Sequence, residues 1–124
     1  EFLRVLVMHQ NVMRGNISER MGLARWRQAW RDIMATGVDL VLCGHDHEEA
    51  FGTLPNGAVV ATSGTPTSRT RGGRPSACHP GVVDDESITV SHMIWDPKAG
   101  EFNTGPEKRF ERSRDPRSQV DPVF

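Results

Sequence analysis

Two apolar runs, separated by a segment with helical periodicity, constrain the fold of this 124-residue chain most strongly. Residues 3–8, broken only by Arg4, and residues 38–43 are each almost continuously apolar, as strands buried on both faces are. Between them, apolar residues recur at helical spacing: Leu23, Trp26, Trp30, Ile33 and Met34. The order predicts a strand–helix–strand unit and an α/β fold.

The ends of the helix carry their own signals. Ser18 is a candidate N-cap, because its hydroxyl can accept a hydrogen bond from a free backbone N–H of the first turn. Glu19 suits the positive end of the helix dipole. Gly37 is a natural stop, since helices often end in a left-handed residue that glycine adopts without strain.

The topology has a consequence for three histidines. A helical crossover makes the two strands parallel, so their C-terminal ends lie at one edge of the sheet. His9 and His45 each lie just past such an end. Open α/β sheets bind ligands in the crevice outside those ends. We therefore expect His9 to lie near His45 and His47.

The triplet His45-Asp46-His47 itself suggests a metal site. If it is extended, both imidazoles project to one side and Asp46 to the other. Two such rings can serve one metal, or two metals about 3.5–4 Å apart, as in two-metal hydrolases. Imidazole binds zinc, iron, nickel and copper, so histidine alone does not select the metal.

The rest of the chain has the periodicity of strands. Residues 49–53 and 58–62 form a predicted hairpin around Asn56-Gly57, and residues 64–86 a long loop rich in Gly, Pro, Ser and Arg. Residues 87–95 alternate as a strand and turn into a shorter one around Phe102. We expect one domain at 1–103 and an extended or disordered tail at 104–124.

Composition excludes several classes of protein. Fifteen basic against sixteen acidic residues give a net charge of -1, which argues against nucleic acid or an anionic membrane as a partner. No apolar stretch is long enough to span a bilayer. No signal peptide opens the chain and only two cysteines occur, so we expect a cytoplasmic location without a disulfide framework.

A family resemblance becomes specific at these motifs. Residues 38–47, ending in Gly44-His45-Asp46-His47, resemble the closing Gly-His-x-His motif of the calcineurin-like metallophosphoesterases. Residues 5–9 resemble the strand and metal-binding histidine that precede it, and residues 61–66 also fit. The resemblance covers roughly residues 3 to 103 and is strongest to the cyclic-nucleotide phosphodiesterase-like branch. It implies an α/β sandwich and metal-dependent hydrolysis of a phosphodiester or phosphomonoester.

The resemblance also implies a site. His9 and His45 would ligate one metal of a dinuclear centre, and His47 the other, the metals being two divalent ions of manganese, iron or zinc. The substrate would be a small phosphoester. Arg69 and Arg71, in the long loop, are candidate substrate-binding residues, because guanidinium groups bind phosphate in a bidentate manner.

Several motifs of the family are missing from this sequence, which affects what the chain can do alone. The family's Asp-x-His, Gly-Asp-x-x-Asp and Gly-Asn-His-Asp/Glu motifs do not occur here, and its His-His-Pro is represented by His9-Gln10-Asn11. Three neutral imidazoles do little to offset two adjacent divalent cations. We therefore expect the C-terminal half of such a domain, a strand–helix–strand unit followed by β-hairpins. It would be inactive until an N-terminal half or a swapped neighbour supplies carboxylates.

Two other hypotheses remain open. His9, His45 and His47 could form one mononuclear zinc site with an open fourth position. Alternatively, the chain is a non-enzymatic interaction fragment that folds with a partner, or forms a homodimer, through an uncovered apolar face. His79 and His92 are expected to be a loop residue and a strand-surface residue, without a role as ligands.

Overall fold

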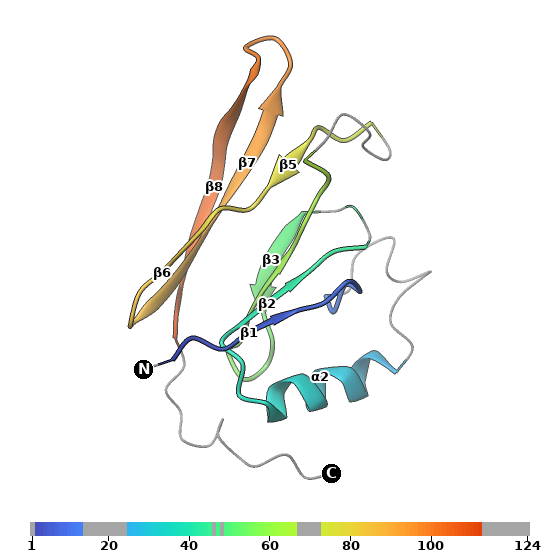
Figure 1. Ribbon diagram of the computed structural model, residues 1–124, viewed down its shortest axis with the longest axis vertical. Coiled ribbons are helices and arrows are strands. Elements are labelled where there is room, and N and C mark those ends of the chain that lie inside the picture. Colours follow the sequence, from blue (N-terminus) through green and yellow to red (C-terminus); the bar gives the residue numbers. More distant parts are fainter. Residues whose placement is uncertain (1, 14–24, 46, 48, 67–72, 113–124) are drawn as a thin grey trace.

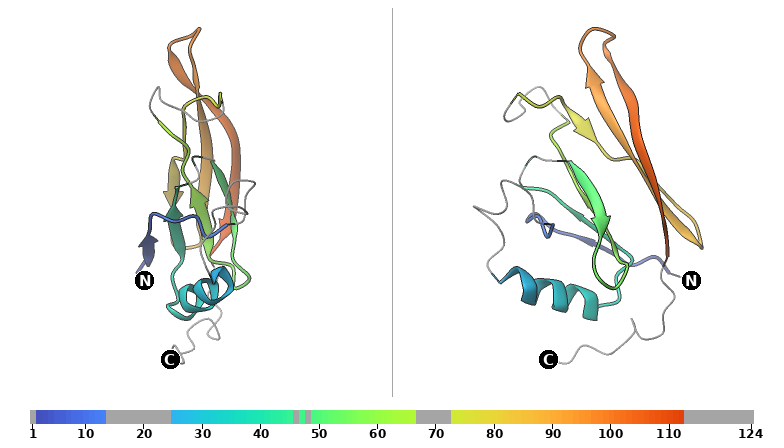
Figure 2. Two further views of the ribbon diagram at one scale, coloured as in Figure 1. Left: turned by 90° about the vertical axis from the view of Figure 1, so that its right-hand side faces the viewer. Right: turned by 180° about the vertical axis from the view of Figure 1, so that it is seen from behind.

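The computed structural model describes residues 2–13, 25–45, 47, 49–66 and 73–112, which form three layers (Figure 1). Helix α2 (Trp26–Ala35) packs on one face of a four-stranded sheet, and a second sheet covers part of the other face. Seen from behind, the layers follow in the same order (Figure 2).

The strands form two sheets. In spatial order the first sheet contains β1 (Val5–Val7), β2 (Leu40–Cys43), β4 (Val59–Thr62) and β3 (Ala50–Thr53). In the second sheet, β5 (Ala77–Cys78) and β6 (Gly81–Val83) share one edge of β7 (Ser87–Asp96), and β8 (Glu101–Glu111) pairs with the other.

The predicted strand–helix–strand unit is confirmed. Strands β1 and β2 are parallel, with Val5 opposite Leu40, and helix α2 connects them. The helix ends at Ala35, and Gly37 beyond it takes the expected left-handed conformation, with a φ of 69° and an N–H that donates to the Met34 carbonyl. The helix begins at Trp26, directly after Arg25 with a left-handed φ of 58°, and not at the predicted Ser18. Ser18 and Glu19 themselves lie outside the described residues.

The predicted β3–β4 hairpin is also confirmed. The strands are antiparallel, with Thr53 opposite Val59. Gly57 has a φ of 88° in the turn, and its N–H donates to the Leu54 carbonyl. A residue with a Cβ would be strained at that φ, which explains the need for glycine.

Two expectations about the second half differ from the structure. The ordered sheet continues beyond the expected boundary at residue 103, because β8 pairs with β7 as far as Glu111. Most β8 side chains are exposed, so its composition resembles a tail, and Phe110 alone is buried. The expected loop at 64–86 contains β5 and β6, so Cys78 lies in a strand; Cys43 and Cys78 are both free.

The core has two parts, one on each face of the first sheet. Between helix and sheet lie Val12, Ile33, Val41, Cys43, Leu54, Ala58 and Val60. Between the sheets lie Leu40, Val59, Ala61, Ile88, Val90 and Phe110. Neighbouring residues of β2 thus point to opposite layers, which is why that strand is almost continuously apolar.

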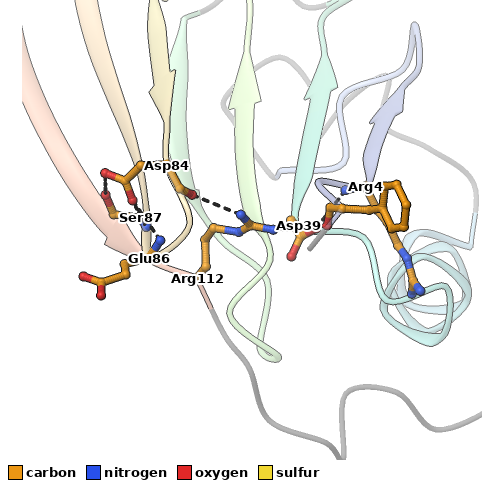
Figure 3. A network of polar contacts seen from close by, with 7 residues as sticks. Arg4, Asp39, Asp84, Glu86, Ser87 and Arg112 are labelled. Atoms are coloured by element: carbon orange, nitrogen blue, oxygen red, sulfur yellow. Dashed lines mark hydrogen bonds and ion pairs between the residues drawn. The ribbon is translucent and has the colours of Figure 1, made fainter.

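A polar network joins the sheets at the end opposite the histidines (Figure 3). The Arg112 guanidinium donates to the Asp84 and Phe2 carbonyl oxygens, at 3.0 and 3.2 Å, and lies 3.6 Å from Asp39 Oδ2. Asp39 Oδ2 also accepts from the Arg4 backbone N–H. The network connects the beginnings of β1 and β2 to the end of β8. No helix in the described part of the chain is long and apolar enough to span a bilayer.

Candidate functional site

Parallel pairing of β1 and β2 brings His9 and His45 together. The Met8 N–H donates to the Leu42 carbonyl and the Gly44 N–H donates to the His9 carbonyl, so the pairing continues past both strands. His9 Nε2 and His45 Nδ1 lie 2.8 Å apart at hydrogen-bonding distance. Their rings meet edge to face, with centroids 4.8 Å apart. The expected proximity of these two histidines is present in the structure.

The backbone at the triplet differs from the extended form that we expected. His45 has a φ of 76° and His47 a φ of 59°, both left-handed. L-residues adopt this region at a cost of roughly 1–2 kcal/mol, and such strain is often found at functional sites. The two side chains consequently take different directions. His45 reaches His9, whereas His47 Nδ1 lies 2.9 Å from Thr65 Oγ1. Asp46 lies outside the described residues.

All three histidines line one open cavity of about 610 Å³. The remaining lining residues are mostly apolar or small: Val7, Met8, Leu42, Cys43, Gly44, Ala61, Ser63, Gly64, Thr65, Pro66, Ala77, Cys78 and His79. The volume is within the range of small-molecule sites. Among the described residues, no group of three His, Cys, Asp or Glu side chains is arranged to hold a metal ion.

The His9–His45 pair nevertheless suits a shared cation. Nitrogens bound to one tetrahedral zinc at 2.0–2.1 Å stand about 3.3 Å apart. The 2.8 Å between His9 Nε2 and His45 Nδ1 is close to that separation. With the His9 proton on Nδ1 and the His45 proton on Nε2, both facing nitrogens would be free to ligate. The donor set fits one edge of a metal site, and further donors are required.

The expected substrate-binding residues Arg69 and Arg71 lie outside the described residues. The neighbouring Arg74 is described, and its guanidinium lies 3.7 Å from Glu49 Oε2. This arginine therefore pairs with a carboxylate of the protein at the end of the loop that carries His47.

The sequence analysis missed a second polar group, formed by Glu49, His79 and His92. Glu49 Oε1 lies 3.5 Å from His92 Nε2, and the rings of His79 and His92 have centroids 5.0 Å apart. Burial, then the nearby His92, lowers the pKa of His79 below its usual 6.5. The alternation of strand 87–95 was a usable signal, because it places His92 on the inward face of Ile88 and Val90.

Comparison with known proteins identifies the fold. No protein-family model and no curated protein matches this sequence at a significant level. Two solved structures do match: Vacuolar Protein Sorting 29 from Cryptosporidium parvum, with a TM-score of 0.55, and a conserved uncharacterized protein, a predicted phosphoesterase, from Streptococcus pneumoniae, with 0.54. The chain therefore has a metallophosphoesterase-like fold.

The likeness to this metallophosphoesterase fold is structural. Sequence identity is 16% to each protein, and each match covers 81% of this chain. The chain spans about half of the matched proteins, 50% of the first and 54% of the second. The predicted α/β fold class is thereby confirmed.

Proposed function

We propose that this chain supplies His9, His45 and His47 to the dinuclear metal centre of a phosphoester hydrolase. The observation that carries the proposal is the distribution of the three rings. His9 and His45 form a pair, and His47 lies apart from it at Thr65 on the same cavity. A pair on one ion and a single ligand on a second is the distribution that the resemblance implies. The metallophosphoesterase fold supports it independently.

The same distribution argues against a mononuclear zinc site. Three histidines on one tetrahedral ion would place three nitrogens within about 3.3 Å of one another. His47 Nδ1 instead makes its contact with Thr65 Oγ1, at 2.9 Å. The proposed dinuclear site accounts for the separation of His47 from the His9–His45 pair, whereas a mononuclear site does not.

Metal ions held here would lower the pKa of a water molecule and neutralise the phosphoryl oxygens. The residues of this chain would hold and orient the ions. Arg69 and Arg71 would hold the substrate phosphate, a phosphodiester if the cyclic-nucleotide branch is the correct one. Repulsion between two divalent ions requires bridging carboxylates. Glu49 does not serve, because its carboxylate lies against Arg74 and His92.

We propose that the carboxylates come with strands that extend the first sheet beyond β1. Within the described part of the chain, β1 pairs only with β2. The face of β1 and β2 that continues the inter-sheet core is open, with Val5, Val7 and Leu42 exposed by 43, 73 and 39%. An uncovered apolar face of this kind usually marks an interface. Its occupant would be an N-terminal half of the fold, either covalently linked or from a neighbour.

Reconstitution tests the function. The chain is produced together with the segment encoded directly upstream of Glu1, and hydrolysis of bis-p-nitrophenyl phosphate is measured with added manganese. We expect metal-dependent hydrolysis from the combination and at least 100-fold less from the chain alone, since a metal without its ligands is not retained. The upstream segment should contain Gly-Asp-x-x-Asp and Gly-Asn-His motifs.

A matched control variant distinguishes loss of the proposed ligands from a general effect of substitution on folding. His45→Ala together with His47→Ala should abolish hydrolysis, whereas Lys98→Ala, in the distant β7–β8 turn, should retain it. Full activity after loss of both His45 and His47 would refute the proposal. An upstream sequence without these acidic motifs would rule out the covalently linked half.

A further inference from the structure

Glu49, His79 and His92 form a partly buried contact between the two sheets. Glu49 follows the His47 loop of the first sheet, His92 belongs to β7, and His79 directly follows β5. The Glu49 and His92 side chains are only 12 and 17% exposed. The Glu49 carboxylate lies between the layers, with His92 Nε2 at 3.5 Å on one side and the Arg74 guanidinium at 3.7 Å on the other.

His79 is the unusual member of this group. Its two ring nitrogens are buried and, within the described part of the chain, make no hydrogen bond of standard geometry. The ring packs edge to face against Phe51, with centroids 5.5 Å apart, and tilts against His92. A neutral imidazole tolerates this apolar setting far better than a cation does.

The charges around His79 define what a proton there would meet. Glu49 is attractive and His92, when protonated, is repulsive. Arg74 shares the Glu49 carboxylate and so weakens its attraction for a second cation.

Within the described residues, the other elements around the group bring no charge to His79. Cys78 of β5 and Phe51 of β3 are uncharged, and β8 places Gly105 against the His92 backbone. A proton on His92 faces Glu49 directly; a proton on His79 is favoured by Glu49 and by the Thr62 backbone, but burial and His92 outweigh both.

We propose that Glu49, His79 and His92 act as a proton-sensitive latch, which joins the two sheets while His79 is neutral and loosens when His79 gains a proton. The latch involves none of the candidate metal ligands and does not depend on the proposed hydrolase activity. Because Glu49 lies two residues after His47, loosening the latch frees the end of the loop that carries the site.

The lowered pKa of His79 determines how the stability of the folded chain changes with pH. Burial first, then His92, lowers the pKa of His79 in the folded chain below 6.5. Between that lowered pKa and 6.5 the unfolded chain binds more protons than the folded one. The stabilisation is therefore complete above pH 6.5 and is lost as the pH falls through the pKa of the folded state.

Titration of the histidine side chains by NMR tests the latch on the 124-residue chain. We expect His79 to titrate below 6.5, and the backbone amides of Glu49 and Ala50 to shift with the same midpoint. His92→Gln, which removes a like charge, should raise the pKa of His79. Glu49→Gln, which removes an attractive charge, should lower it further. A purely structural role would not produce these opposite shifts.

His79→Gln gives an independent arm, since glutamine keeps a polar group but does not titrate. In this variant the Glu49 and Ala50 amides should no longer shift at the midpoint of His79. If His79→Gln fails to fold, the NMR titration of His79 in the unmodified chain still tests the latch. A His79 midpoint at or above 6.5, or one that neither His92→Gln nor Glu49→Gln moves, would overturn the proposal.

Discussion

At the scale of single residues, the backbone of the His-Asp-His triplet explains how adjacent histidines reach different partners. His45 and His47 both occupy the left-handed region, so one ring meets His9 and the other meets Thr65. A fully extended triplet would have sent both rings to one side of the strand. The left-handed backbone directs the two rings to different parts of one cavity, as the proposed two-metal site would require.

This strain can be measured with a matched pair of variants. His45→Gly and His45→Ala both lose the imidazole, but only glycine adopts a φ of 76° without cost. We expect His45→Gly to be more stable than His45→Ala by about 1 kcal/mol. Urea denaturation of both variants measures the difference. Equal stabilities would mean that the left-handed backbone at this position carries no strain.

The sequence allowed the location of His9 and His45 to be predicted, but not their conformations. Strand polarity alone brings those two residues to one edge of the sheet. The left-handed angles could not be predicted, because they depend on contacts such as that between His47 and Thr65, eighteen residues apart. His79 was missed for a similar reason, since its burial depends on Phe51 and His92.

At the scale of elements, the first sheet is protected on the β4 side and open on the β1 side. Val60 is completely buried beneath the helix, whereas Val7 is 73% exposed, although both occupy apolar strands. The strands themselves and the β3–β4 turn were predictable from local pattern. The length of β8 was not, because backbone pairing with β7 sustains a strand whose side chains are nearly all exposed.

Two valine truncations test this asymmetry. Val60→Ala removes fully buried methyl groups and should lower the free energy of unfolding by about 2 kcal/mol. Val7→Ala, at the open edge, should change it by less than about 0.5 kcal/mol. Chemical denaturation of the isolated chain measures both. A large effect of Val7→Ala would show that the β1 face is covered in the isolated chain.

At the scale of the whole molecule, the fold is a sandwich whose inter-sheet core continues into an uncovered apolar face. The chain spans about half the length of the two solved structures that share its fold. The fold class could be predicted because it follows from the strand–helix–strand order. The extent of the open face could not, since it depends on how far the second sheet reaches over β1 and β2.

The open face should govern association in solution. We expect the isolated chain to self-associate as its concentration rises, and Val7→Lys to shift it towards monomer by placing a charge on the apolar face. Size-exclusion chromatography with light scattering measures the molar mass of both. As a control, Lys98→Ala, in the distant β7–β8 turn, should behave as the unmodified chain does. If the unmodified chain, Val7→Lys and Lys98→Ala all have the same molar mass, the open face is not the surface through which the chain associates.

The central claim is that these three histidines hold two metals only when carboxylates from another part of the fold join them. Metal content measured on dialysed protein tests it most directly. We expect two manganese ions per molecule in the reconstituted assembly, fewer than one in the chain alone, and loss of both after His45→Ala with His47→Ala. Two ions retained by the chain alone, or by the doubly substituted assembly, would contradict the account.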